Sequence, residues 1–157
     1  MLQAKRSSLL GHDYEISRDD QPFTRLELKR HSARFSVDRA EYQVKGHRFR
    51  RTYELLAADG SVVASTGRVS RTWTLEAAGR AVRFERPSPL SRETSMLGED
   101  GQPAGSIRRQ GAADSGATAD LPGLEPRLEL FALAVVLMRQ RSKRTAAGAR
   151  GAALSGG

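Results

Sequence analysis

Residues 121–141 read LPGLEPRLELFALAVVLMRQR, and within them lies the longest apolar run of the chain, LFALAVVLM at 130–138. In a helix this run makes about two and a half turns without a polar face, so apolar partners must surround it on every side. A sheet curled around the helix supplies that environment. We therefore expect a helix from about 126 to 144 at the centre of the fold. Its expected core residues are Leu130, Phe131, Leu133, Val136 and Leu137.

Two other interpretations of the run deserve comparison. A tail anchor would cover only about 13 Å of a hydrocarbon layer of about 30 Å, which is too short for a span. A final buried strand is the second alternative, because Val135 and Val136 are β-branched. Pro126, which is tolerated in the first helical turn, and the strong helix formers that follow it favour the buried helix.

Short segments of alternating apolar and polar residues precede this helix. Three longer segments are interrupted near the middle by turn residues, and each therefore predicts a β-hairpin. These turn residues are Asp59-Gly60, Ala78-Gly79 and Asp100-Gly101. The expected strands occupy 23–30, 35–37, 42–44, the two arms of hairpins at 51–69, 73–84 and 96–107, and 117–121. The expected fold class is mainly β (α+β): an antiparallel β-barrel of short hairpins wrapped around one hydrophobic C-terminal helix.

The chain length fits a single domain. We expect that domain at 10–144, with a flexible N-terminus at 1–9 and a disordered tail at 145–157, because chain ends rich in small and polar residues tend to fray. Residues 111–116 (GAADSG) have the composition of a flexible loop. Pro87 and Pro89 lack a backbone donor, so they mark a connection or an edge.

This order of elements, with Asp-Gly hairpins closed by the segment at 121–141, resembles the tubby C-terminal domain superfamily, which includes phospholipid scramblases and plant LURP-one-related proteins. The resemblance covers residues 10–144 and implies a small prokaryotic type of member. It implies a closed barrel around a hydrophobic C-terminal helix, and binding to phosphoinositide or other lipid headgroups through basic residues. The chain has no acidic loop that matches a scramblase calcium site and no cysteine for palmitoylation.

Charge is the strongest functional signal in the composition. The formal net charge is +8, arginine outnumbers lysine 22 to 4, and residues 139–157 contain five cations and no carboxylate. Such a balance favours anionic partners such as phospholipid surfaces or nucleic acid.

The absence of cysteine excludes disulfides and thiolate chemistry. No apolar signal core precedes residue 15. We therefore expect a soluble cytoplasmic protein that is peripheral at membranes.

No catalytic or metal-binding arrangement is recognisable in the sequence. His12, His31 and His47 lie outside any nucleophile motif, and the glycines Gly98 and Gly101 lack the lysine and the helix that a phosphate loop requires. We therefore expect a non-enzymatic protein without metal or cofactor.

The remaining candidate is a basic patch. Cations gather around 29–34 and 45–51, on strands expected to be neighbours, with Arg48 and Arg50 on one sheet face and Phe49 on the other. The predicted anionic-ligand residues are Lys29, Arg30, Arg34, Lys45, Arg48, Arg50 and Arg51. A sheet face whose cations are simply solvated is the simpler interpretation of this patch.

The predicted function is a monomeric binding module for an acidic phospholipid headgroup at a membrane surface or for a partner protein. Nucleic-acid binding through the patch and the basic tail is the alternative.

Overall fold

The computed structural model of the chain describes residues 1–7 and 11–155, with side chains described through 148. Its elements in chain order are β1 (Leu2–Arg6), β2 (Asp13–Arg18), β3 (Gln21–Leu28), β4 (Ser32–Val37), β5 (Ala40–His47), β6 (Thr52–Ala57), β7 (Val62–Thr66), β8 (Thr72–Ala77), β9 (Arg80–Glu85), β10 (Glu93–Leu97), β11 (Pro103–Gln110), a 3₁₀ turn (Ala112–Asp114), β12 (Gly116–Asp120) and α1 (Pro126–Ser155).

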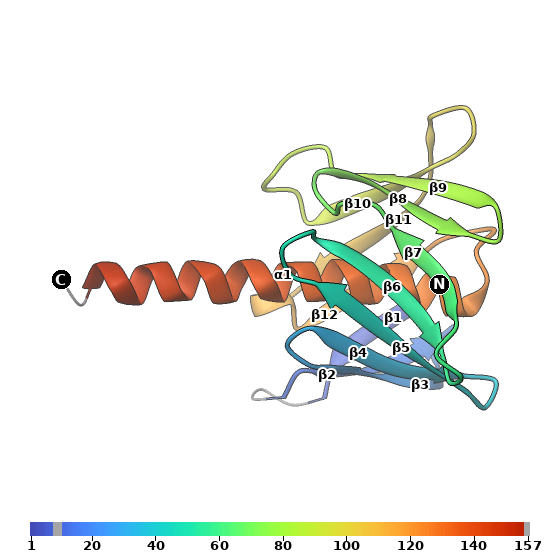
Figure 1. The fold of residues 1–157 in the computed structure, drawn as a ribbon, viewed down its shortest axis with the longest axis horizontal. Coiled ribbons are helices and arrows are strands. Elements are labelled where there is room, and N and C mark those ends of the chain that lie inside the picture. The colour runs from blue at the N-terminus through green and yellow to red at the C-terminus, as the bar shows by residue number, and fades with distance from the viewer. Residues whose placement is uncertain (8–10, 156–157) are drawn as a thin grey trace.

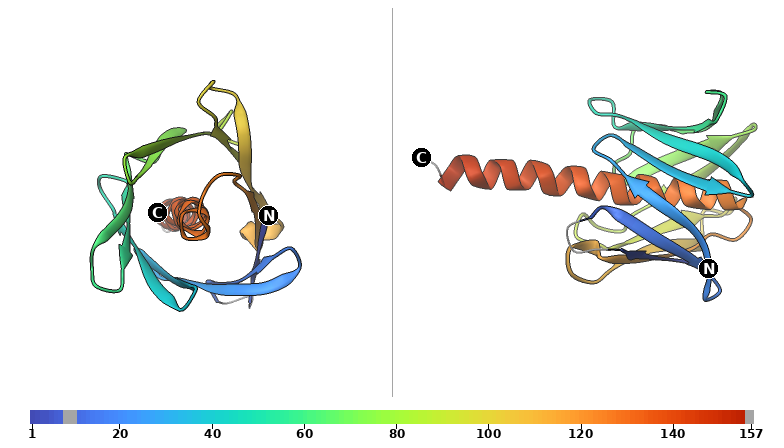
Figure 2. Two further views of the ribbon diagram at one scale, coloured as in Figure 1. Left: turned by 90° about the vertical axis from the view of Figure 1, so that its right-hand side faces the viewer. Right: turned by 90° about the horizontal axis from the view of Figure 1, so that it is seen from below.

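The expected fold class is confirmed. The twelve strands found among the described residues form a closed antiparallel meander in which each strand pairs with the next, and β1 pairs with β12 to complete the ring. Figure 2 shows α1 enclosed by this ring of strands when the barrel is viewed along its axis. Closure leaves no free sheet edge and gives the helix apolar neighbours on all sides.

Along the strands, apolar residues at every second position face the interior of the barrel and the polar residues between them face outward. Leu26 and Leu28 on β3, and Trp73 and Leu75 on β8, are buried while their neighbours along the strand are more exposed. Trp73 and Phe84 face each other across the β8–β9 pair and stack with ring centroids 4.4 Å apart. The three hairpins with Gly-containing turns are all present, as β6–β7, β8–β9 and β10–β11.

The apolar run of α1 lies inside this wall. Leu130, Phe131 and Leu133 are fully buried and Leu137 nearly so, whereas Val136 is only partly buried. One carboxylate accompanies the run: Glu129 is buried and accepts a hydrogen bond of 2.9 Å from Nη2 of Arg18 on β2. This ion pair compensates the buried charge at the point where the helix enters the barrel.

The boundaries of the domain differ from the expectation at both ends. Residues 2–6 are not a flexible arm but strand β1, which pairs with β2 as well as β12. The helix does not stop at 144 but continues to Ser155 and projects beyond the barrel (Figure 1), so the prediction of a disordered tail is wrong for 145–155. The predicted flexibility of residues 8–9, and the predicted disorder of 156–157, fall outside the described residues.

Two local predictions are also wrong. Arg48, Phe49 and Arg50 do not alternate along a strand, because they lie in the turn that joins β5 to β6. Residues 111–116 are not a featureless loop, since they contain the 3₁₀ turn and the buried Asp114. Both differences matter for the functional surface.

Candidate functional site

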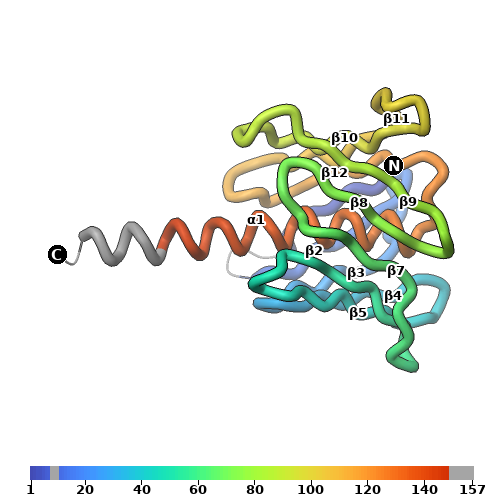
Figure 3. The backbone as a smooth tube through the Cα atoms, turned by 45° about the horizontal axis from the view of Figure 1, so that its top comes forward, coloured from blue at the N-terminus to red at the C-terminus, as the bar shows by residue number. Residues whose placement is uncertain are grey.

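The two ends of the barrel carry opposite charge. In an antiparallel meander, successive connections alternate between the two ends, as the tube in Figure 3 shows. We call the end where α1 starts the proximal end and the end where α1 leaves the barrel the distal end. The connections β2–β3, β4–β5, β6–β7, β8–β9, β10–β11 and β12–α1 lie at the proximal end, and the other connections lie at the distal end.

Carboxylates dominate the proximal connections. Within the part of the chain that the structure describes, these connections contain one cation, Arg39, and the carboxylates Asp19, Asp20, Asp38, Asp59, Glu99, Asp100 and Glu125. Turn geometry accounts for much of this composition. Asp19, Asp20 and Asp38 have positive φ angles, which aspartate tolerates better than most residues, and the Asp59 carboxylate accepts a hydrogen bond from the backbone of Ser61.

The distal connections are strongly basic. We call the following cations the basic rim: Lys29, Arg30, Arg48, Arg50, Arg51, Arg68, Arg71, Arg86 and Arg92. Among the described residues, Asp114 is the one carboxylate in the distal connections. Only Arg51 in the rim has a positive φ, and arginine has no special aptitude for turns. The backbone therefore accounts for the proximal aspartates but does not account for the basic rim.

The helix adds four more cations at the same end. Arg139, Arg141, Lys143 and Arg144 follow the apolar run directly and line crevices between α1 and the distal connections. The helix dipole does not explain these cations, because α1 continues to Ser155 and the dipole effect is confined to the last turn.

Two large apolar side chains stand among these cations. Phe49 in the β5–β6 connection and Leu90 in the β9–β10 connection are each 92% exposed. The Arg48 guanidinium lies 5.9 Å from the centroid of the Phe49 ring. Single exposed apolar residues are common, but here both lie in connections of the basic rim.

The structure divides the predicted patch in two. Arg30, Arg48 and Arg51 line one crevice, in which His31, His47 and Arg139 also take part. Lys29 and Arg50 are exposed in the same two connections.

The other two predicted residues, Arg34 and Lys45, lie exposed on the outer wall of the barrel. Arg34 pairs in register with Glu27 of β3, and Lys45 pairs with Glu54 of β6. These two positions are therefore not part of the basic rim.

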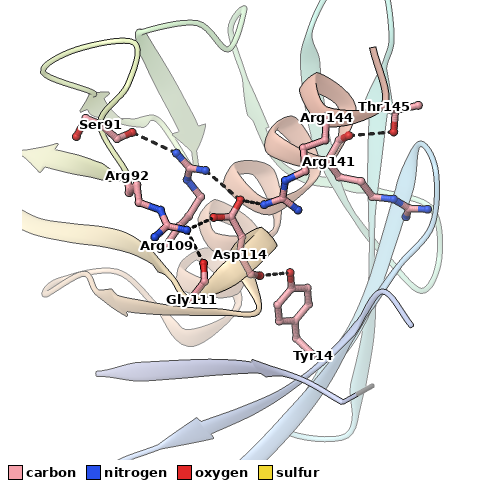
Figure 4. A network of polar contacts seen from close by, with 9 residues as sticks. All are labelled: Tyr14, Ser91, Arg92, Arg109, Gly111, Asp114, Arg141, Arg144 and Thr145. Atoms are coloured by element: carbon pink, nitrogen blue, oxygen red, sulfur yellow. Dashed lines mark hydrogen bonds and ion pairs between the residues drawn. The ribbon is translucent and has the colours of Figure 1, made fainter. Parts of the chain in front are cut away.

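Asp114 connects the helix to the barrel at the distal end (Figure 4). Its side chain is 4% exposed and accepts hydrogen bonds from Arg92 at 3.2 Å, from Arg109 at 3.0 Å and from Arg144 of α1. Tyr14 of β2 donates its hydroxyl to the Asp114 backbone oxygen at 2.8 Å, and burial raises the pKa of this phenol. One carboxylate thus joins three arginines, from the β9–β10 connection, β11 and α1, at the mouth of the barrel.

Sequence reasoning missed Asp114 and two of the rim connections, β7–β8 and β9–β10. The available signal for Asp114 was weak: it is the only carboxylate between Asp100 and Asp120. Arg68, Arg71, Arg86 and Arg92 are separated from the predicted patch by whole strands, and they reach the same end only because connections alternate around the ring.

The described residues contain no group of three potential metal ligands. Among them, no helix has both the length and the apolarity needed to cross a bilayer. A comparison of the chain with protein-family models, curated proteins and solved structures finds no match in any of the three. Membership of the tubby-like superfamily therefore stays a prediction.

Proposed function

We propose that the protein is a non-enzymatic, peripheral membrane-binding module that docks its distal end on acidic phospholipid headgroups. The observation that carries this proposal is the segregation of charge: the basic rim and the α1 cations share one end, and the proximal connections are acidic. Such a dipolar molecule orients with its distal end toward an anionic surface, and each surface-proximal Lys or Arg contributes about 1 kcal/mol of attraction.

Phe49 and Leu90 favour a membrane over other anionic partners. A bilayer offers headgroup phosphates for the arginines and, directly beneath them, an apolar layer for exposed aromatic and aliphatic side chains. Nucleic acid remains the second candidate, because the Phe49 ring with Arg48 beside it is also suited to stacking on a base. An aliphatic side chain such as Leu90 gains little from a base, so the pair of exposed residues favours lipid.

Vesicle co-sedimentation tests the proposal. The protein should bind vesicles of phosphatidylcholine with 30% phosphatidylserine and should not bind phosphatidylcholine alone. Replacing Arg48 and Arg50 by Gln removes two rim cations, so we expect the partition coefficient to fall by about 30-fold, which corresponds to about 2 kcal/mol. Replacing Phe49 and Leu90 by Ala should weaken the binding that persists at high salt, where electrostatic attraction is screened.

The matched control removes the same charge away from the distal end. Arg39→Asn with Arg83→Gln deletes one proximal cation and one outer-wall cation, and Asn suits the positive φ of residue 39. This control should bind acidic vesicles almost as well as the unmodified chain. Equal losses in both double variants would show that net charge alone drives binding. Binding to DNA or RNA but to neither kind of vesicle would support the second candidate instead.

A further inference from the structure

A crevice between α1 and two distal connections concentrates positive charge. We call it the cationic crevice; it is lined by Val69, Ser70, Trp73, Thr94, Val136 and Gln140 together with the cations Arg86, Arg109, Arg139 and Lys143. No carboxylate is among these lining residues. Trp73 belongs to the hydrophobic core and Val136 packs against it, so apolar side chains border the partly buried cations and water screens their charges less than in open solvent.

Three of the four cations in the crevice are not neutralised by the described residues of the protein. Arg109 is engaged by Asp114 and by the backbone oxygen of Ser91, but Arg86, Arg139 and Lys143 form no ion pair within the described residues. The Nε atoms of Arg86 and Arg139 are buried and have no hydrogen-bond partner among those residues. A buried donor without an acceptor is costly, and no described residue satisfies the hydrogen-bonding capacity of these two guanidinium groups.

The pKa of Lys143 reflects its burial and the surplus of positive charge in the crevice. Burial, followed by the neighbouring charges of Arg86, Arg139, Arg109 and Arg51, lowers the pKa of Lys143 to about 8. Burial also lowers the pKa of Arg86 and of Arg139. An anion in the crevice would raise the pKa of Lys143 again, because an opposite charge within about 4–6 Å favours the protonated amine.

We propose that the cationic crevice is a binding site for the dianion of a phosphomonoester, held by Arg86, Arg139 and Lys143. A phosphomonoester offers up to two negative charges and three terminal oxygens, which suit two guanidinium forks and one ammonium group. A phosphodiester offers one charge and two such oxygens and is bound less well. The inference rests on the proposed function insofar as the phosphomonoester belongs to a lipid headgroup; free phosphate is the other source of the same chemistry.

The test follows the lysine amines of the isotopically labelled full chain by NMR as the pH is raised. Only four lysines are present, so Lys5, Lys29 and Lys45 serve as internal controls. With 20 mM inorganic phosphate or glycerol 3-phosphate in place of chloride at equal ionic strength, the pKa of Lys143 should rise by about 1 unit or more, and the other three should stay unchanged. The phosphodiester glycerophosphocholine should have a much smaller effect.

Variants and vesicles then separate the two sources of phosphate. Arg86→Gln should abolish the phosphate response of Lys143, whereas Arg83→Gln on the outer wall should retain it. On vesicles of matched surface charge, the unmodified chain should prefer phosphatidic acid over phosphatidylglycerol, and Lys143→Met should lose that preference but still bind both.

Each outcome decides one proposal. A Lys143 pKa that does not respond to phosphate, together with equal binding to the two acidic lipids, would overturn the crevice site and leave the membrane proposal standing. A phosphate response without any vesicle binding would support the crevice as a site for a soluble phosphomonoester and would overturn membrane docking.

Discussion

The variant Leu133→Asp is expected not to fold. Leu133 is fully buried in α1 at the centre of the barrel, and an aspartate there would place an unpaired carboxylate among apolar side chains. The cost of several kcal/mol for such a charge, added to the lost packing, is comparable to the whole stability of about 5–15 kcal/mol of a domain. We expect the loss of near-ultraviolet circular dichroism from Trp73 and the loss of a cooperative thermal transition.

The control for this variant is Val62→Asp. Val62 is also an aliphatic residue, but it is 56% exposed at the start of β7, so its replacement should leave the melting temperature within a few degrees of the unmodified value. Cooperative melting of Leu133→Asp near the temperature of the Val62 variant would contradict the central position of α1.

The variant Asp114→Asn should destabilise the folded chain by about 3 kcal/mol. The change leaves Arg92, Arg109 and Arg144 without their shared carboxylate, and removal of one partner from a buried pair typically costs about 3–5 kcal/mol. The lower value is expected because Arg92 and Arg144 are partly exposed. Asparagine tolerates the positive φ of residue 114, so the backbone contributes little to the effect.

Urea unfolding measures this loss as a lower midpoint at an unchanged slope. Asp100→Asn is the matched control, since Asp100 is exposed in the β10–β11 turn and asparagine can keep its hydrogen bond to the Gln102 amide. The control should stay within about 0.5 kcal/mol of the unmodified chain. Equal midpoints for the two variants would show that Asp114 does not hold the helix to the barrel.

The barrel and its central helix were predictable because their signals are local. Alternation at pairs such as Trp73 and Leu75, Gly-containing turns, and an apolar run without a polar face each point to one structure within a few residues. Strand β1 lacked such a signal: its inward residues are Leu2 and Ala4, and its partner β12 is more than a hundred residues away. The helix beyond 144 was not predicted because small and polar residues at a chain end usually fray, although the alanines among them are the strongest helix formers.

The candidate site depends on contacts that no short window of sequence contains. Arg48-Phe49-Arg50 has the alternation of a strand, and only the pairing of β5 with β6 reveals it as a turn. Asp114 binds Arg92 and Arg144, which lie 22 and 30 residues away. The basic rim follows from the meander itself, since alternate connections around a closed ring share one end. Loop charge can therefore be assigned to the two ends once the strand order is known.

The most direct test of the orientation uses the absence of cysteine from the chain. Single cysteines at Ser88, in the distal β9–β10 connection, and at Gln102, in the proximal β10–β11 turn, are both exposed sites for an environment-sensitive nitrobenzoxadiazole label. Vesicles with 30% phosphatidylserine should shift the emission of the Ser88 label to the blue and increase it, and should leave the Gln102 label unchanged. A response at Gln102, or none at Ser88 while the protein is bound, would contradict docking through the distal end.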